Sequence, residues 1–250
     1  MATAGILPGI ATKIMKTTTK FDIVDFHAHI LPGADHGCIS VDDALFQLNS
    51  ASAQGVSRII AAPHFYPHKH HVSTFISKRN SAYGQLRSHL TPDMPAITLG
   101  AEVLICDGIE EMPELDSLFI EGTRTLLLEL PMNTFSYKYT ESVEQMTRAG
   151  IDVIIAHADR YDPENIHQLL EVGARLQLNV SSLNCIFLKK HIRSWISEGK
   201  VVALGTDIHG RDKLAYKKFA RAISRRSLNI SRIKTESDKI WHRSKKSINT

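Results

Sequence analysis

Two pairs of potential metal ligands stand far apart in this chain, and both pairs have i,i+2 spacing. His27 and His29 lie in Val24-Asp25-Phe26-His27-Ala28-His29, and Asp207 and His209 lie in Leu204-Gly205-Thr206-Asp207-Ile208-His209. Each pair closes an apolar run rich in β-branched residues, so on a strand both side chains point to the same face. Imidazole and carboxylate groups gathered in this way are suited to bind a metal ion.

Four further apolar runs also end on a residue that can bind a metal, namely His64, Glu102, Glu129 and His157. An isolated histidine is more often a hydrogen-bonded core or surface imidazole than a ligand. The recurrence at the end of one run after another favours the ligand here. Parallel barrels collect their functional groups at the carboxyl ends of the strands, so we expect the ligands to meet at such a rim.

The mixture of donors indicates which metals and which reaction to expect. Imidazoles with carboxylates suit Mn²⁺, Fe²⁺ or Zn²⁺ better than Ca²⁺, which prefers oxygen ligands. Glu102 and Glu129 each have two oxygens that can bind different ions, so the sequence predicts more than one metal. Closely spaced ions lower the pKa of a bound water and neutralise charge on a phosphoryl oxygen, which points to ester hydrolysis.

An arginine follows the last of these single ligands. Arg160 lies three residues after His157, just beyond a predicted strand end. Its guanidinium could bind a phosphate through two hydrogen bonds and stabilise charge developing on it. The alternative is a surface ion pair with Asp159 or Asp162, and the residues alone do not decide between the two.

Competing phosphatase chemistries are excluded by spacing. None of the three cysteines, Cys38, Cys106 and Cys185, is followed six residues later by the arginine that a cysteine-dependent tyrosine phosphatase requires. The chain also has no G-x-x-x-x-G-K-[ST] loop for nucleotide phosphates and no G-x-S-x-G turn for a serine hydrolase.

The elements that must position these residues alternate between strand and helix. Ser40 is a plausible N-cap, with Asp42 and Asp43 in the first turn of a helix that ends near Gly55. Repeated β-then-α order predicts a parallel sheet that is either closed into a barrel or open and doubly wound, and ligands on nearly every strand favour the barrel. The predicted strands are 22–27, 57–63, 96–102, 125–130, 151–157, 175–181 and 200–206.

Composition indicates one large α/β domain. The chain has 250 residues, of which 43% are hydrophobic. An odd number of cysteines without a C-x-x-C favours a reducing cytoplasm over a disulfide framework or a zinc ribbon. Residues 1–20 have three lysines and no acidic residue, but Gly5, Pro8 and Gly9 interrupt their apolar run, so we expect an N-terminal extension and not a membrane span or signal peptide.

Positive charge is concentrated at the other end of the chain. Residues 211–250 hold 13 of the 30 Lys and Arg but only 3 of the 26 Asp and Glu. Such a segment could meet anionic lipid, nucleic acid or an acidic partner. No aromatic interleaving or recognition motif accompanies the charge, so we expect no nucleic acid and predict that residues 221–250 form a solvated, partly disordered basic extension.

The motifs together resemble the polymerase and histidinol phosphatase (PHP) superfamily, and within it the bacterial capsule-associated, manganese-dependent protein-tyrosine phosphatases. The resemblance covers about residues 21–214. Its most specific parts are Leu128-Glu129-Leu130-Pro131-Met132-Asn133-Thr134 and the Arg160-Tyr161 that follows the histidine at position 157.

The resemblance implies a distorted seven-stranded (βα) barrel of the PHP type over residues 21–220, with three divalent ions, Mn first and Fe or Zn as alternatives. Its activity is the removal of phosphate from tyrosine, notably on the tail of a bacterial tyrosine kinase that controls capsule or exopolysaccharide export. Arg160 would bind the substrate phosphate. By the same resemblance, the ions would be held by His27, His29, Glu102 and Asp207; by Glu102, Glu129 and His157; and by His36, His64 and His209.

Two departures from the family pattern concern the site. The family usually has Asp-Asp-Gly after the first histidine pair, whereas this chain has Asp35-His36-Gly37, so one ligand becomes an imidazole and the metal preference is expected to shift. After His209 the family has Arg-Pro-Pro, and here only Arg211 or Lys213 could replace that arginine as a second phosphate-binding residue.

Two other functions stay open at this point. One is a small-molecule phosphomonoesterase of the same superfamily, such as a histidinol-phosphate phosphatase. The other is a non-catalytic barrel that binds partners, which the retention of all nine metal-capable residues argues against. The sequence does not indicate the oligomeric state.

Overall fold

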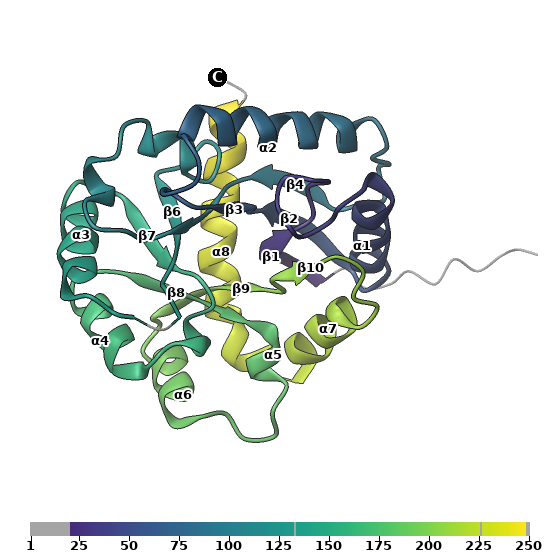
Figure 1. The fold of residues 1–250 in the computed structure, drawn as a ribbon. Coiled ribbons are helices and arrows are strands. Elements are labelled where there is room, and N and C mark those ends of the chain that lie inside the picture. The colour runs from purple at the N-terminus through teal and green to yellow at the C-terminus, as the bar shows by residue number, and fades with distance from the viewer. Residues whose placement is uncertain (1–20, 133, 226, 249–250) are drawn as a thin grey trace, which may run out of the picture.

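Parallel strands form the centre of the molecule, and helices surround them (Figure 1). The computed structural model describes residues 21–132, 134–225 and 227–248, so the predicted N-terminal extension, residues 1–20, lies outside the described residues. The strands are β1 (Phe21–His29), β2 (Val56–Ala61), β3 (His64–Phe65), β4 (Ala96–Leu99), β5 (Glu102–Leu104), β6 (Thr125–Glu129), β7 (Asp152–Ile155), β8 (Arg175–Asn179), β9 (Val201–Gly205) and β10 (Ile208–His209).

The helices alternate with these strands over most of the chain, as the sequence predicts. Seven of the strands, β1, β2, β4, β6, β7, β8 and β9, correspond to the seven predicted ones. The helices are α1 (Val41–Ala53), α2 (Val72–Arg87), α3 (Tyr137–Arg148), α4 (Pro163–Glu171), α5 (Val180–Leu183), α6 (Lys190–Ser197), α7 (Ala215–Arg225) and α8 (Ser227–Ile248), with short 3-10 turns η1 (Ile109–Glu111), η2 (Leu115–Leu118) and η3 (Ala158–Arg160).

The strands pair as two parallel sheets, in the orders β10-β1-β2-β4 and β3-β5-β6-β7-β8-β9. The parallel α/β class is confirmed, but the pairing of the described strands does not give the single closed seven-stranded barrel that we expected. The ladders are interrupted where the chain passes from β2 to β3, from β4 to β5 and from β9 to β10. Pro63, which has no N–H to donate, lies at the first interruption, and Gly100 lies at the second.

Backbone hydrogen bonds continue across these interruptions and hold the ends of the strands together. The Gly100 N–H donates to the Ala61 carbonyl at 2.9 Å, and the Asp207 N–H donates to the His27 carbonyl at 2.7 Å. The short strand β10 then pairs with the end of β1, with Ala28 opposite Ile208. The first and last strands therefore lie side by side at their carboxyl ends.

Helix α1 begins as its sequence predicts. The Ser40 side chain accepts a hydrogen bond from the Asp43 N–H at 3.2 Å, which satisfies one of the free donors of the first turn. Gly55 follows the helix with φ of 80°, a left-handed conformation that favours glycine. This βα unit carries the chain from the end of β1 to the start of β2.

The C-terminal segment is helical and packed, so the predicted solvated extension at 221–250 is wrong for its described residues. Ile230, Ile233, Ile240 and Trp241 of α8 are buried. Ile240 and Trp241 belong to the same apolar cluster as strand residues from the interior of the fold, such as Phe26. Apolar residues recur here at helical spacing between the charges, and they give α8 a core-facing stripe.

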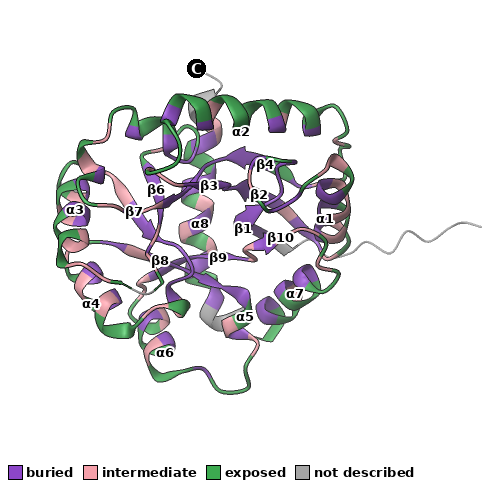
Figure 2. Ribbon diagram, viewed as in Figure 1, coloured by how far each residue is buried: buried purple, intermediate pink, exposed green. Residues whose placement is uncertain are grey.

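Helix α8 lies across the amino ends of the strands, behind them in Figure 1. Asp238 pairs with Arg58 of β2 at 2.8 Å, and the Lys245 ammonium donates to the Ile97 carbonyl of β4 at 3.2 Å. The strands are buried, while the outer faces of the surrounding helices are exposed (Figure 2). No helix among the described residues is both long and apolar enough to cross a membrane. The carboxyl ends of the strands, at the end of the fold opposite α8, are therefore not covered by this helix.

Candidate metal centre

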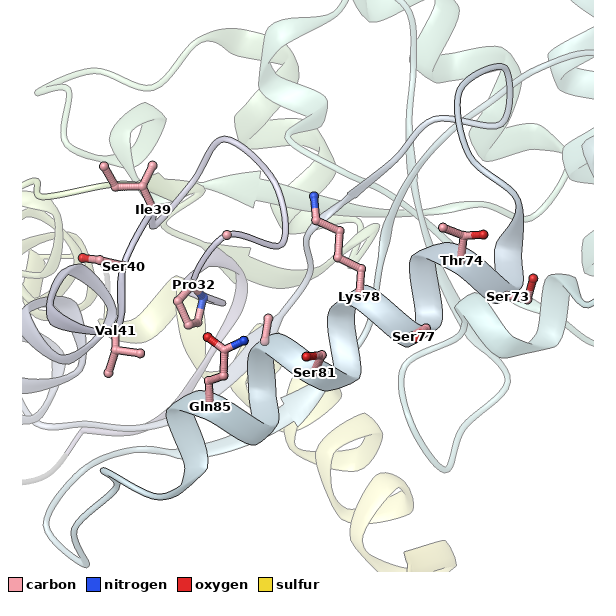
Figure 3. A pocket seen from close by; sticks show the side chains of 12 residues that line it. Pro32, Ile39, Ser40, Val41, Ser73, Thr74, Ser77, Lys78, Ser81 and Gln85 are labelled. Carbon is pink, nitrogen blue, oxygen red and sulfur yellow. The ribbon is translucent and has the colours of Figure 1, made fainter.

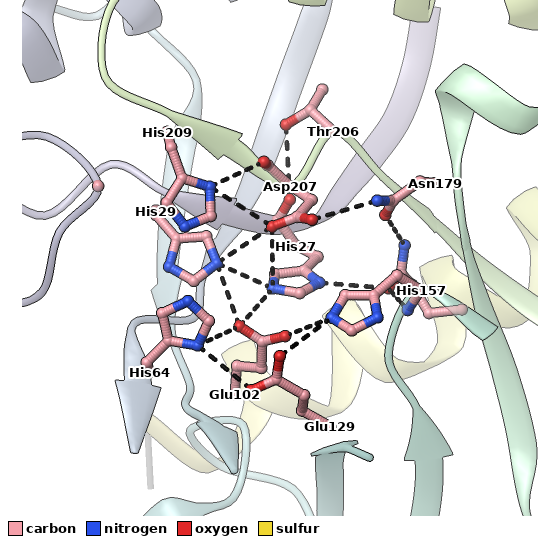
Figure 4. Close-up of polar contacts among 12 residues, drawn as sticks. His27, His29, His64, Glu102, Glu129, His157, Asn179, Thr206, Asp207 and His209 are labelled. Atoms are coloured by element: carbon pink, nitrogen blue, oxygen red, sulfur yellow. Dashed lines mark hydrogen bonds and ion pairs between the residues drawn. The ribbon is translucent and has the colours of Figure 1, made fainter. Parts of the chain in front are cut away.

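Eight of the nine predicted metal ligands converge at the carboxyl ends of the strands, as Figure 4 shows. The histidine pair closes β1, Glu102 opens β5, Glu129 closes β6, and Asp207 and His209 follow β9. Alternation along β1 turns both imidazoles to the same side, as their spacing predicts. The eight residues are His27, His29, His64, Glu102, Glu129, His157, Asp207 and His209.

Glu102 lies at the centre of the group and is fully buried. Its Oε2 is 2.8 Å from Nδ1 of His64, 3.2 Å from Nε2 of His27 and 3.3 Å from Nε2 of His29. Its Oε1 is 2.7 Å from Nε2 of His157. Burial alone would raise the pKa of this carboxyl, but the surrounding histidines hold the pKa well below its usual range. The buried group is therefore a carboxylate.

Several buried donor atoms have no hydrogen-bond partner among the described residues, as a metal site requires. Nε2 of His209 and Nδ1 of His157 make no hydrogen bond, and Nδ1 of His64 meets Oε2 of Glu102 at 2.8 Å as an ion pair. Unpaired buried polar atoms are costly unless something else binds them. Nitrogen and oxygen lone pairs that face a common centre fit divalent metal ions.

The atoms fall into three groups, and within each group the ligand atoms lie within 4.8 Å of one another. His29 belongs to two of the groups and His64 also belongs to two, so the groups are linked. Such an arrangement fits a cluster of ions better than one isolated ion. The groups are His29, His64 and His209; His27, His29 and Asp207; and His64, Glu102 and Glu129.

The electrostatics of the site favour positive charge. Burial alone would lower the pKa of His29, but hydrogen bonds to Asp207, Asp35 and Glu102 raise it well above its ordinary value. His64 is also buried, yet Glu102 and Glu129 raise its pKa to about 9. Carboxylates that stabilise an imidazolium in this way also attract a metal cation.

Two buried side chains that our sequence analysis did not predict as site residues orient the first histidine pair. Nδ1 of His29 lies 2.6 Å from Oδ2 of Asp35, and Nδ1 of His27 lies 3.2 Å from Oε1 of Gln177. When each Nδ1–H donates to these acceptors, the lone pair of each Nε2 is directed into the cluster. Gln177 Oε1 also accepts a hydrogen bond from the His157 N–H at 2.7 Å.

A third missed residue, Asn179, lies beside Gln177 on the same face of β8. Asn179 donates from Nδ2 to Oδ2 of Asp207 at 3.2 Å, and its Oδ1 accepts from Nε2 of Gln177 at 3.1 Å. The spacing of Gln177 and Asn179 in the apolar run Leu176-Gln177-Leu178-Asn179 is the same i,i+2 signal that identified the histidine pairs. The spacing was therefore visible in the sequence, but amide side chains were not considered as site residues.

Two of the three described non-glycine residues with positive φ belong to the converging group. His157 and Asp207 have positive φ, 32° and 52°, although neither is glycine. Such conformations are uncommon for residues with a Cβ and cluster at functional sites. Close approach is also required at Gly37, where a Cβ would lie 2.4 Å from Cβ of His29. The loop after β1 is thus folded tightly against the first ligand pair.

Arg160 lies at the mouth of the cluster, with a side chain that is 44% exposed. Its Nη2 donates a short hydrogen bond to Oδ2 of Asp207. The ion pairs considered as the alternative are not formed among the described residues, because Asp159 accepts from the Asn179 N–H and Asp162 caps α4. Arg160 is therefore positioned by the ligand set itself.

The other two predicted residues are placed less directly. The His36 ring stacks beside those of His64 and His209, with centroids 4.8 and 4.7 Å away, but His36 is exposed and belongs to none of the three groups of converging atoms. Arg211 pairs with Asp43 at 2.5 Å and lies over the Phe46 ring. A phosphate-binding role for Arg211 stays a prediction.

Comparison with known proteins identifies the family. The family model described as "Capsular polysaccharide synthesis, CpsB/CapC" matches residues 23–228. The chain belongs to the CpsB/CapC family. The resemblance that its motifs indicated is thereby confirmed, and α8, which closes the amino ends of the strands, lies almost entirely beyond the matched residues.

Individual relatives support this assignment. The chain is 32% identical over 171 residues to the CapC protein of Staphylococcus aureus, a match that spans 64% of this chain and 66% of CapC. It is 24% identical over 210 residues to the tyrosine-protein phosphatase CpsB of Streptococcus pneumoniae, spanning 76% and 84%. A solved structure of the metal-dependent tyrosine phosphatases YwqE of Bacillus subtilis and CpsB of Streptococcus pneumoniae superimposes with a TM-score of 0.71 at 20% identity, covering 89% of this chain and 95% of that one. This CpsB/CapC member shares their fold.

Proposed function

We propose that this protein is a metal-dependent protein-tyrosine phosphatase. The observation that carries the proposal is the convergence of buried imidazoles around the Glu102 carboxylate, with the Arg160 guanidinium at the mouth of the same cluster. Relatives named tyrosine-protein phosphatase CpsB support the reaction, and the family description supports a role in capsule synthesis.

Three divalent ions would occupy the cluster, with Mn²⁺ first and Fe²⁺ or Zn²⁺ as alternatives. Bound ions of this kind lower the pKa of water and neutralise charge on a phosphoryl oxygen. The overlap of the groups of converging atoms at His29 and His64 supports more than one ion. We assign one ion to His27, His29, Glu102 and Asp207; a second to Glu102, Glu129 and His157; and a third to His36, His64 and His209.

The chain's own residues contribute binding and orientation. Arg160 presents a planar fork of N–H donors at the exposed mouth, where it would bind the substrate phosphate and hold it over the cluster. Asp35 and Gln177 fix the rings of His29 and His27, so the ligand atoms need not reorganise during the reaction. The phenol of tyrosine has a pKa of about 10, which makes it a better leaving group than an alkyl alcohol.

The substrate would be a phosphotyrosine protein, for which we propose the tail of a bacterial tyrosine kinase, and the family description supports a place in capsule synthesis. A cytoplasmic location, which the free cysteines indicated, is part of this proposal.

Substrate comparison tests the proposed reaction. The manganese-loaded protein should hydrolyse a phosphotyrosine peptide with a kcat/KM at least an order of magnitude above that for histidinol phosphate. The opposite preference would show a small-molecule phosphomonoesterase instead. Absence of turnover on both substrates, with metal bound, would favour a non-catalytic barrel.

A further inference from the structure

Large apolar side chains are exposed in connections that follow the strands whose carboxyl ends carry the metal centre. Among the described residues, four of the six strongly exposed large apolar side chains lie in a connection that directly follows the carboxyl end of a strand, or at the first residue of the helix after it, and the other two lie between α5 and α6, the two helices that follow β8. We call this set the apolar rim, and it consists of Ile39, Met132, Tyr137, Ile186, Phe187 and Leu214.

The connections at the amino ends of the strands lack such exposed apolar side chains among the described residues. In the described part of the chain, the segments that lead from a helix back into a strand carry none of these exposed side chains. That end also holds α8, whose Ile240 and Trp241 are buried. An even scatter of exposed apolar residues would be unremarkable, but their restriction to the face that bears the site indicates an interaction surface.

The exposure is greatest in the connection between α5 and α6. Ile186 is 81% and Phe187 is 89% exposed, and Figure 2 shows this connection as an exposed segment outside the ring of helices. Ile39, in the connection between β1 and α1, is 79% exposed. Because water disfavours such surfaces, their burial against a partner would stabilise a complex.

A groove of about 900 Å³ begins beside Ile39 and runs between residues 32–41 and α2. The α2 side of this groove presents the hydroxyls of Ser73, Ser77 and Ser81 and the ammonium of Lys78 (Figure 3). His36, whose ring stacks on His64 of the metal centre, belongs to the same loop as Ile39. The loop that lines one side of the groove therefore also reaches the metal centre.

We propose that the apolar rim and this groove dock the polypeptide on both sides of a phosphotyrosine, so that apolar residues flanking the phosphotyrosine increase turnover. The inference rests on the proposed phosphatase function. A small phosphomonoester would contact only the metal centre and Arg160 and would leave the rim exposed. A phosphorylated polypeptide is anionic, and it would meet Arg160 at the mouth, Lys69 over the Tyr66 ring that stacks on His64, and Lys78 in the groove.

The experiment compares three probes with the manganese-loaded full chain. The probes are para-nitrophenyl phosphate, a phosphotyrosine peptide with leucine and phenylalanine on both sides, and a matched peptide with glycine and serine there. The variants are Ile186→Asp with Phe187→Asp, and Ile39→Asp alone. Thr235→Asp is the matched control, because it places the same charge at an exposed position of α8 on the far side of the fold.

The wild type and Thr235→Asp should prefer the apolar peptide by roughly ten-fold in kcat/KM, since losing one apolar anchor typically costs about that much. The rim variants should lose this preference through KM while their turnover of para-nitrophenyl phosphate stays unchanged. Equal hydrolysis of the two peptides by the wild type would overturn the inference and leave the phosphatase function intact.

Two further outcomes are informative. If no probe is hydrolysed, the proposed function fails and this inference fails with it. If sedimentation shows that the wild type is a dimer and the rim variants are monomers, the rim is covered by a second copy of the chain and the docking of substrate is overturned.

Discussion

Gln177 allows a direct test of how the metal ligands are held in place. Its side chain is fully buried, and its Oε1 accepts from both the His157 N–H at 2.7 Å and Nδ1 of His27 at 3.2 Å. Gln177→Leu keeps a similar volume but removes this acceptor. Both donors would then be buried without a partner, and the His27 ring would lose the contact that directs its Nε2 into the cluster.

The expected size of the effect follows from these contacts. Each unsatisfied buried donor costs about 1–3 kcal/mol, so the free energy of unfolding of the metal-free protein should fall by about 2–6 kcal/mol. Losing the hydrogen bond that orients a ligating histidine typically weakens metal binding by about 10–100-fold. The affinity for Mn²⁺ should therefore fall by about 1.4–2.7 kcal/mol.

Urea denaturation in the presence of a chelator measures the first quantity, and calorimetric titration with Mn²⁺ measures the second. Gln177→Glu is the matched control, because it retains an acceptor oxygen toward His27 and should bind Mn²⁺ at least as tightly as the wild type. Wild-type affinity in a folded Gln177→Leu protein would refute the positioning role.

Four other perturbations have defined outcomes. Arg160→Ala should nearly abolish turnover of phosphotyrosine peptide without loss of bound metal, and a parallel fall in metal content by elemental analysis would contradict its assignment to the substrate. His36→Asp should preserve activity but change which of Mn²⁺, Fe²⁺ and Zn²⁺ supports it best; an unchanged metal profile would count against a ligand at this position. Trp241→Ala should reduce the free energy of unfolding by about 3–5 kcal/mol because it leaves a cavity under the strands, and a loss below about 1 kcal/mol in urea denaturation would show that α8 is not an integral part of the core. Metal binding at pH 7 should release protons, because His64, with its pKa raised to about 9 in the metal-free protein, holds a proton that the ion must displace. The affinity for Mn²⁺ should therefore rise from pH 7 toward pH 9, and binding heats that do not depend on the buffer would contradict this.

Strand alternation explains why the convergence of these side chains could be predicted. The i,i+2 spacing at His27 and His29 fixes a common face whatever the rest of the chain does, and parallel strands bring their carboxyl ends to one side. Glu102 and His157 could be added because each ends an apolar run. What the spacing could not show is that Arg160 would bind Asp207, a residue 47 positions away.

The prediction was wrong where long-range packing outweighs local composition. Charged residues in 221–250 suggested a solvated extension, yet Ile240 and Trp241 find a core at the amino ends of the strands. Barrel closure likewise depends on how the ladders continue past positions such as Pro63 and Gly100, and the sequence pattern does not specify the pairing there. Gln177 was missed because only residue types that bind metals were considered as candidates. Its amide instead orients the His27 ring.

One measurement tests the central claim most directly: metal content and phosphotyrosine hydrolysis determined on the same purified sample, before chelation, after it, and after Mn²⁺ is restored. We predict more than one divalent ion per chain, loss of hydrolysis on chelation and its recovery with Mn²⁺. Full hydrolysis by the metal-free protein, or a metal-loaded protein that releases no phosphate from phosphotyrosine, would contradict the proposed function.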